Sequence, residues 1–294
     1  MRTSQFAFIA LIAGAIAGPV FGASFEKRVA APSDGVVEIS NVAGLIDVSG
    51  WDRAEVEVTG ELEEGNERVD VSSEGGRTRV RVVVRSHSQH SAEADLRIRV
   101  PHASEVQITA VSSDIHTQGI TGAQRLNTVS GDIRAELGAD ATIKTVSGDL
   151  WVRGSSKPAN LWISTVSGDL RLERAAGSVE ATSVSGLLSL DVDPARQVRA
   201  RTTSGDLSFR GSLEEGATFE VQSISGTLSL RARAPKGYEY EIESFSGEID
   251  SCFNRSNVSD RRYGPGRRLS GVLGDGAGRL RVKSMSGDIE ICDR

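Results

Sequence analysis

Acidic side chains recur at one position of a repeated motif and are the first candidates for chemistry. The motif is Ser or Thr, an apolar residue, Ser, Gly, usually Asp, then Leu or Ile, as in TVSGDI at 128–133. A row of stacked carboxylates could supply the oxygen ligands that Ca²⁺ prefers. However, Leu187 and Thr227 interrupt the row, and the GGxGxD pattern of calcium-binding repeats is absent. We therefore expect either solvated turn carboxylates or side chains that bond nearby backbone amides, and no metal site. The acidic residues in question are Asp132, Asp149, Asp169, Asp206, Glu248 and Asp288.

Serines and histidines are the next candidates. A catalytic serine is normally singular and needs a base that a third group holds in place, whereas eight equivalent serines here follow a structural period. His87 and His90 have an H-x-x-H spacing, but the polar segment around them offers no third metal ligand. His102 and His116 are isolated in the sequence. The sequence thus predicts no catalytic residue, no cofactor and no metal, and a protein that is not an enzyme.

Polysaccharide chemistry is the competing possibility. Trp151 and Trp162 could form a sugar-stacking patch, and carboxylates clustered on neighbouring repeats could hydrolyse a glycan. The residues five positions after successive glycines alternate in sign instead, which favours ion pairs between repeats. Those residues are Glu136, Arg153, Glu173, Asp191, Arg210 and Arg231.

Short strands must position all of these groups. The residue five before each motif glycine is apolar, the residue four before it is polar, and Leu or Ile always comes two after it. Such alternation on both sides indicates two half-buried strands joined at a Ser-Gly bend, where glycine suits a positive φ or a close backbone approach. These structural turns are expected at Gly131, Gly148, Gly168, Gly186, Gly205, Gly226, Gly247 and Gly287.

The spacing of the motif predicts the fold class. Successive motif glycines lie 17 to 21 residues apart, with one final gap of 40. A unit of about 19 residues cannot bury its own apolar face, so equivalent strands must pair in parallel from one unit to the next. We expect an all-β, single-domain parallel β-helix (β-solenoid). Residues 23–105 form an N-terminal β region that caps or continues the stack, and 106–294 form regular coils with an excursion at 253–277.

Two cysteines sit in the same register of the repeat. Cys252 follows Gly247 by five residues, and Cys292 follows Gly287 by five. Neighbouring coils would place them about 4.8 Å apart, within the Cα separation that a disulfide requires. We predict that the last two motif-bearing coils are adjacent and joined by a Cys252–Cys292 disulfide.

The first 22 residues read as a signal peptide. Arg2 precedes an apolar run from Phe6 to Ala17, which is too short to span a bilayer, and small residues follow it. No later stretch is apolar for long enough to cross a membrane. The net charge of −6 is spread over both signs along the chain, which argues against nucleic-acid binding. The sequence predicts an exported protein in the periplasm, on the outer surface or secreted.

Several motifs together resemble a known bacterial family. They are the repeated T-V-S-G-D-[IL], G-W-D-R at 50–53, L-R-I-R-V-P at 96–101 and G-D-G-x-G-R-L at 274–280. In these features the chain is similar to the putative-adhesin, β-strand-repeat domain of unknown function. The resemblance implies a β-solenoid at the envelope with no assigned enzymatic site, and some relatives are associated with envelope stress.

The expected function is that of a cell-envelope or surface structural and interaction module, adhesin-like and non-enzymatic. Its partner would be an envelope component, a glycan or a protein, and exposed terminal coils could associate end to end. The alternatives are a carbohydrate-active enzyme on a β-helix and a component that senses envelope stress.

Overall fold

The computed structural model describes residues 23–63, 66–85, 93–252, 259–260 and 266–293. The all-β prediction is confirmed, because these residues form β-strands and no helix, hence no helix that could cross a membrane. The predicted signal peptide and the His87/His90 pair lie outside the described residues. The strands are β1 (Ala23–Ala30), β2 (Val36–Trp51), β3 (Glu55–Leu62), β4 (Asn66–Glu74), β5 (Arg77–Val84), β6 (Ala94–Pro101), β7 (Glu105–Gln118), β8 (Gln124–Asn127), β9 (Ile133–Glu136), β10 (Ala141–Lys144), β11 (Leu150–Arg153), β12 (Ala159–Ser164), β13 (Leu170–Ser185), β14 (Leu188–Ser204), β15 (Leu207–Ser225), β16 (Leu228–Arg233), β17 (Gly237–Ser246), β18 (Ile249–Ser251), β19 (Ser259–Asp260), β20 (Arg267–Gly274), β21 (Gly278–Ser286) and β22 (Ile289–Cys292).

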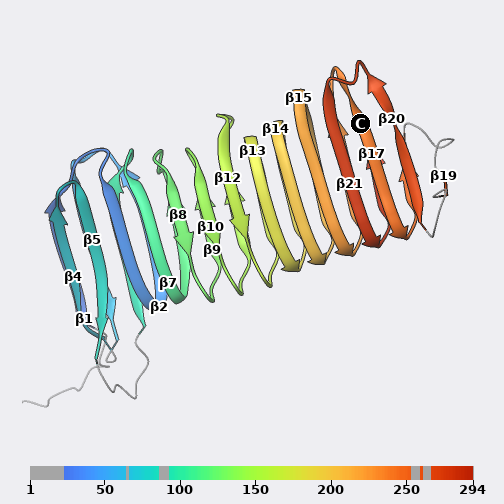
Figure 1. Ribbon diagram of the computed structural model, residues 1–294. Helices are drawn as coiled ribbons and strands as arrows, with labels where there is room; N and C mark the ends of the chain where they lie inside the picture. Colours follow the sequence, from blue (N-terminus) through green and yellow to red (C-terminus); the bar gives the residue numbers. More distant parts are fainter. Residues whose placement is uncertain (1–22, 64–65, 86–92, 253–258, 261–265, 294) are drawn as a thin grey trace, which may run out of the picture.

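The strands form two parallel ladders that meet at the Ser-Gly corners. The pre-corner ladder joins the strand segments before each corner, for example β8 to β10 and β10 to β12, in one-to-one register. The post-corner ladder joins the segments after each corner, for example β9 to β11 and β11 to β13. Strands β13, β14 and β15 are long because each runs through one turn of the chain and contributes to both ladders. Figure 1 shows the result as a long row of stacked strands.

The apolar positions of the repeat fill the space between the two ladders. All eight residues five before a motif glycine are fully buried, from Leu126 to Val282, and those two after it are at most 6% exposed. The alternation predicted from the sequence is therefore confirmed on both sides of the corner. This burial is what a single unit cannot achieve alone, so the core exists only through stacking.

The order of the stack departs from chain order at its C-terminal end. The pre-corner part of β15 pairs in parallel with β21 rather than with β17, and β21 pairs on its other side with β17. The post-corner ladder repeats this order, with β22 between β16 and β18. Figure 1 shows β21 between β15 and β17. The last coil in the sequence is therefore the second-to-last coil in the stack. The spacing of the motif does not predict this exchange.

The N-terminal end has the same kind of exchange. Strand β2 pairs in parallel with β7 on one side and with β5 and β6 on the other. In the chain, however, β5 and β6 lie between β2 and β7. Gly44 of β2 lies opposite Ser113 of β7, so β2 already carries a corner of the regular kind. Strand β2, which lies within the N-terminal region predicted over 23–105, thus pairs in parallel with the first regular strand.

Antiparallel strands lie at the ends of the stack. At the N-terminal end β1 pairs with β3 and β4 pairs with β5, both antiparallel. At the C-terminal end β20, from the predicted excursion over 253–277, pairs antiparallel with β17, and β19 pairs antiparallel with β20. Strands β3 and β4 thus pair with the outer edges of β6 and β5, and β20 pairs with the outer edge of β17, where a parallel ladder could otherwise continue.

Candidate functional site

The Ser-Gly corners lie in a column along one edge of the stack, which we call the corner edge. Parallel bridges connect Ser112 to Ser130 and continue through the corner serines to Ser185. A Cβ built on Gly148 would lie 2.2 Å from the carbonyl oxygen of Gly131, and the same contact links each later corner glycine to its neighbour in the stack. Seven of the eight have a positive φ, from 108° at Gly186 to 153° at Gly247. The eight are Gly131, Gly148, Gly168, Gly186, Gly205, Gly226, Gly247 and Gly287.

Backbone bonding at the corner explains why an acidic residue follows the glycine. The Ser147 amide donates to the Val129 carbonyl (2.9 Å), and the Gly148 amide donates to the Ser167 carbonyl (3.3 Å). The next amide, that of Asp149, donates instead to the side-chain oxygen Oδ1 of Asp132, at 3.0 Å. A carboxylate on the preceding coil thus accepts a hydrogen bond from the one corner amide that has no backbone acceptor.

The same bond repeats along the corner edge, and we call these acceptors the aspartate row. Each uses Oδ1 to accept the amide at the equivalent position of its neighbour in the stack, at 2.8 to 3.0 Å. The amides of Leu187 and Thr227 donate such a bond, but neither residue can accept one from the next amide, since neither has a carboxylate. Within the described residues no group of acidic, His or Cys side chains could hold a metal ion. The row consists of Asp95, Asp114, Asp132, Asp149, Asp169, Asp206 and Asp288.

An exposed apolar row runs beside the aspartate row on the corner edge. These residues lie two before each corner glycine, where strand alternation places the side chain outward, yet nearly all are apolar. Val146 is 48% exposed and Ile224 is 54% exposed. Thr203 is the one polar member. In stack order the apolar row is Val42, Val111, Val129, Val146, Val166, Val184, Thr203, Ile224, Met285 and Phe245.

The apolar row is long and borders a groove at its C-terminal end. At roughly 4.8 Å per coil its ten members extend over about 43 Å. Around Thr203 a groove of about 670 Å³ opens between the row and the outer face of the pre-corner ladder. Ile224, Met285 and Phe245 form its apolar side, and Arg201 and Lys283 lie on its polar side. Sequence reasoning missed this surface, although apolar residues at a position that alternation turns outward were the available signal.

The carbohydrate hypothesis needs correction in one respect. Trp151 lies on β11 of the post-corner ladder and Trp162 lies on β12 of the pre-corner ladder. The two outward-pointing rings therefore lie on opposite faces and form no common patch. A cation covers each ring, the guanidinium of Arg134 at 4.3 Å from the Trp151 centroid and the Lys144 ammonium at 4.4 Å from the Trp162 centroid.

The other predicted polar positions are scattered over the surface. In the outward row after the corners, Arg153 and Glu136 form the expected ion pair between coils, at 3.7 Å. His116 contacts Arg134 at 3.2 Å, while His102 contacts the carbonyl of Gly119 and lies 3.6 Å from the carboxylate of Asp52. Neither histidine contacts a corner serine.

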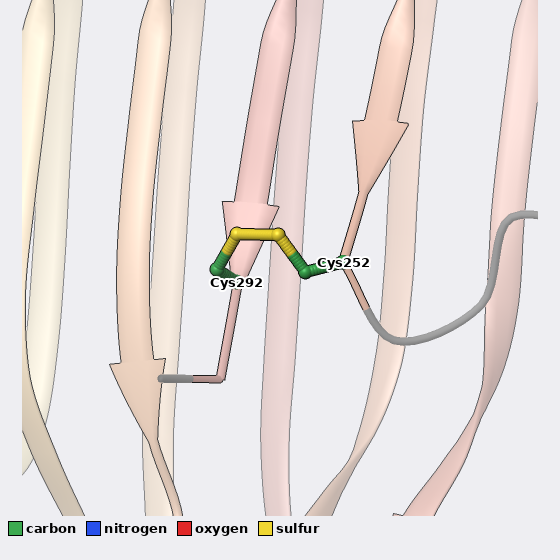
Figure 2. The surroundings of a disulfide bond; sticks show 2 residues. All are labelled: Cys252 and Cys292. Carbon is green, nitrogen blue, oxygen red and sulfur yellow. A yellow bond between two sulfur atoms is a disulfide. The ribbon is translucent and has the colours of Figure 1, made fainter.

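The two cysteines form a disulfide at the C-terminal end. Figure 2 shows the bond between Cys252 and Cys292. Cys252 follows β18 and Cys292 ends β22, and their Cα atoms are 5.0 Å apart. The adjacent pairing of β18 with β22 brings the two residues together across 40 positions of sequence.

Comparison with known proteins gives one family match. The model of the family described as Toastrack DUF4097 matches residues 29–210 and, in a second alignment, 138–292. No curated protein matches the chain.

Solved structures of low similarity also match. A putative adhesin from Bacteroides fragilis shares 10% identity over 92% of this chain and 97% of that chain, with a TM-score of 0.34. A putative cell adhesion protein from Clostridium sporogenes shares 8% over 92% and 99%, with a TM-score of 0.25. A putative lipid binding protein from Parabacteroides distasonis shares 10% over 91% and 96%, with a TM-score of 0.29.

Proposed function

The chain belongs to the Toastrack DUF4097 family, and on this premise we propose that it is an exported, non-enzymatic interaction module of the cell envelope or cell surface. Its partner binds along the corner edge. The observation that carries the proposal is the apolar row, because an apolar stripe about 43 Å long is uncommon on the surface of a soluble monomer and is typical of binding surfaces.

The proposed architecture is a single-domain parallel β-helix with exchanged coils at both ends. In-register parallel pairing through β7, β8, β10 and β12 supports this class, as does the column of corner glycines. Such a rod holds its outward side chains at fixed intervals, so a partner meets a preformed surface and little ordering is required on binding.

The chemistry of the corner edge supports binding rather than catalysis. Every regular corner repeats the same serine, and most repeat the same acceptor role for a carboxylate, so no corner is distinguished as a reaction centre. One oxygen of each aspartate in the row is already bound to a backbone amide, which fixes the carboxylate in a structural role. An enzyme would need a singular group held near a base or an acid.

Export is proposed from two features. Residues 1–22 have the composition of a signal peptide, and the Cys252–Cys292 disulfide is of the kind that persists in oxidising compartments. Cell fractionation with an antibody tests this part, with recovery expected in the periplasm, at the outer surface or in the medium. Recovery of the reduced chain in the cytoplasm would contradict it.

Binding to envelope preparations from the host cell tests the proposed edge. Purified protein carrying Val166→Asp should bind such preparations at least tenfold more weakly, because the substitution places a charge in the middle of the apolar row. Val272→Asp is the matched control, since Val272 is 63% exposed on β20, away from the corner edge. Equal binding by both variants and the parent would refute the corner edge as the binding surface. Turnover of an envelope polysaccharide by the purified protein would favour the enzyme alternative.

A further inference from the structure

A second hollow lies on the outer face of the pre-corner ladder, away from the corner edge. It has a volume of about 430 Å³ and is formed by residues at the start of the pre-corner segments in five successive coils, from β8 to β14. This volume falls in the range of about 300–1,000 Å³ that is usual for small-molecule sites. Trp162, half-buried on β12, supplies its one aromatic side chain.

Trp162 offers a flat apolar surface in this hollow. The Lys144 ammonium lies over the indole ring, 4.4 Å from its centroid, but Lys144 is not among the residues that line the hollow. The ammonium group thus holds one face of the indole through a cation–π contact, and Trp162 also forms part of the wall of the hollow. An aromatic ring fixed in this way provides a stacking surface at a low cost in side-chain entropy.

A connected set of polar groups borders the same hollow. Asp140 accepts the Asn160 amide at 2.8 Å and the Asn160 side-chain Nδ2 at 3.1 Å. The Oδ1 atom of Asn160 accepts Arg196 Nη2 at 3.3 Å, and Arg196 Nε donates to Ser178 Oγ at 3.2 Å. Asp140 and Arg196, from two other coils, thus hold the side-chain amide of Asn160 in one orientation, and Ser178 binds Arg196 in turn. This is the arrangement expected of a preorganised recognition group.

The balance of charge narrows the class of ligand. Arg125, a cation of the wall, is paired with Glu105, and Glu180, an anion of the wall, is 3.5 Å from Arg201. Arg196, at the border of the hollow, directs Nε and Nη2 at the neutral Ser178 and Asn160 side chains, so a phosphate ester would have to displace these bonds. An acyl chain would meet a single aromatic ring among mostly polar side chains. Thr142, Gln197 and Ser178 add groups that both donate and accept hydrogen bonds.

We propose that this hollow is a carbohydrate-binding site in which a pyranose ring stacks on Trp162 and its hydroxyl groups bond to Asn160 and the neighbouring polar side chains. A pyranose has an apolar face of C–H bonds and a rim of hydroxyls that donate and accept, so it matches one aromatic surface bordered by amide and hydroxyl groups. The site goes beyond the proposed binding at the corner edge and does not depend on it, because it lies on a different surface of the rod.

Binding of soluble oligosaccharides to the purified protein tests the proposal. The probes are cellotriose, maltotriose, the trimer of N-acetylglucosamine and trigalacturonate, each titrated by calorimetry and by tryptophan fluorescence. At least one is expected to bind, and Trp162→Ala should weaken that binding tenfold or more, as loss of a stacking aromatic ring commonly does. Asn160→Ala should weaken it by a similar factor, while Trp162→Phe should retain part of it.

Trp151→Ala is the matched control, since that ring lies on the opposite face and has a cation over it in the same way. It should bind the probe like the parent, and so should Val166→Asp, which separates this site from the corner edge. Circular dichroism and thermal unfolding establish that each variant is folded. Equal loss in Trp151→Ala and Trp162→Ala, no loss in Trp162→Ala, or no binding of any probe by the parent would overturn the proposal.

Discussion

The central coils and the C-terminal end of the stack use the same motif but are assembled differently. From β8 to β15 each coil pairs with the next one in the chain, and loops of a few residues connect them. At the C-terminal end the last coil, β21 and β22, lies between β15–β16 and β17–β18, and a disulfide joins it to its neighbour. The motif thus makes coils compatible with one another without specifying which coil lies next to which.

Different interactions secure the two regions. Central coils are held by corner hydrogen bonds that repeat at most levels, such as the one that the Asp149 amide donates to Asp132. The C-terminal end has one such bond, from Asp288 to the amide of Glu248, and adds a covalent link and an antiparallel edge strand. Because a stacked repeat is stabilised mainly by its nearest neighbours, changes in either region should have mainly local consequences.

Removal of the disulfide should cause the largest loss of stability, and this loss should be confined to the C-terminal end. The double variant Cys252→Ser, Cys292→Ser releases a loop of 40 residues, for which chain entropy predicts a loss of about 4 kcal/mol. Hydrogen exchange should show faster exchange in β17, β18 and β20–β22, with unchanged protection in β8–β12. Loss of protection across the whole stack would show that the end governs the stability of the centre.

A side chain at a corner glycine should disrupt the centre instead. The Cβ of Gly168→Ala would lie 2.2 Å from the carbonyl oxygen of Gly148, at a φ of 122°, so we expect a loss of about 3 kcal/mol or more. Gly216→Ala is the control, because φ there is also positive, at 76°, but nothing lies within 4 Å of the added carbon; it should cost about 1 kcal/mol. Similar losses in the two variants, measured by denaturant unfolding, would mean that backbone strain rather than close stacking makes glycine necessary.

Loss of one acceptor in the aspartate row should have a smaller effect. Asp149→Ala leaves the amide of Asp169 without its partner at 2.9 Å, which should cost about 1.5 kcal/mol. Asp149→Asn keeps a side-chain oxygen acceptor and should restore much of that stability. If Asn were as damaging as Ala, the negative charge rather than the hydrogen bond would be the stabilising feature.

Adding an acceptor at a corner that lacks one should increase the stability of the protein. Leu187 is 41% exposed at a corner and offers no side-chain acceptor to the amide at Asp206. Leu187→Asp should therefore raise the free energy of unfolding by about 1 kcal/mol, less any repulsion from Asp169 and Asp206 at low salt. Thermal unfolding at several salt concentrations would measure both contributions, and a destabilised variant at high salt would contradict the assigned role of the row.

The smallest predicted effect on stability is a pH dependence at the N-terminal end, where the order of the coils is also exchanged. Burial raises the pKa of Glu38, but hydrogen bonds and charge from Arg79 and Arg77 outweigh it, so the pKa lies below the usual 4.5. A carboxylate with a lowered pKa stabilises the fold above its unfolded pKa, and this stabilisation is lost as the pH falls through the folded pKa. Glu38→Gln should flatten the acid dependence of unfolding at this end, as followed by hydrogen exchange in β2 and β5. An unchanged pH profile would show that the ion pairs with Arg77 and Arg79 contribute nothing there.

Local pattern was enough to predict the strands, the corners and the disulfide register. Alternation around Gly148 places Ile143 and Leu150 inward because successive strand residues face opposite sides, and equal offsets from Gly247 and Gly287 place Cys252 and Cys292 at the same level of their coils. The same reasoning, applied to Val146 two residues before Gly148, would have indicated an exposed apolar row. These features depend only on positions within one repeat.

Only the tertiary structure decided which repeats are neighbours and what their side chains reach. The exchange of coils at both ends, the bond from each aspartate to an amide 17 or more residues away, and the separation of Trp151 from Trp162 onto opposite faces all involve contacts between repeats. Because every corner presents nearly the same backbone and the same motif, many pairings are locally equivalent. The packing of the end strands and the path of the connecting chain select one of them.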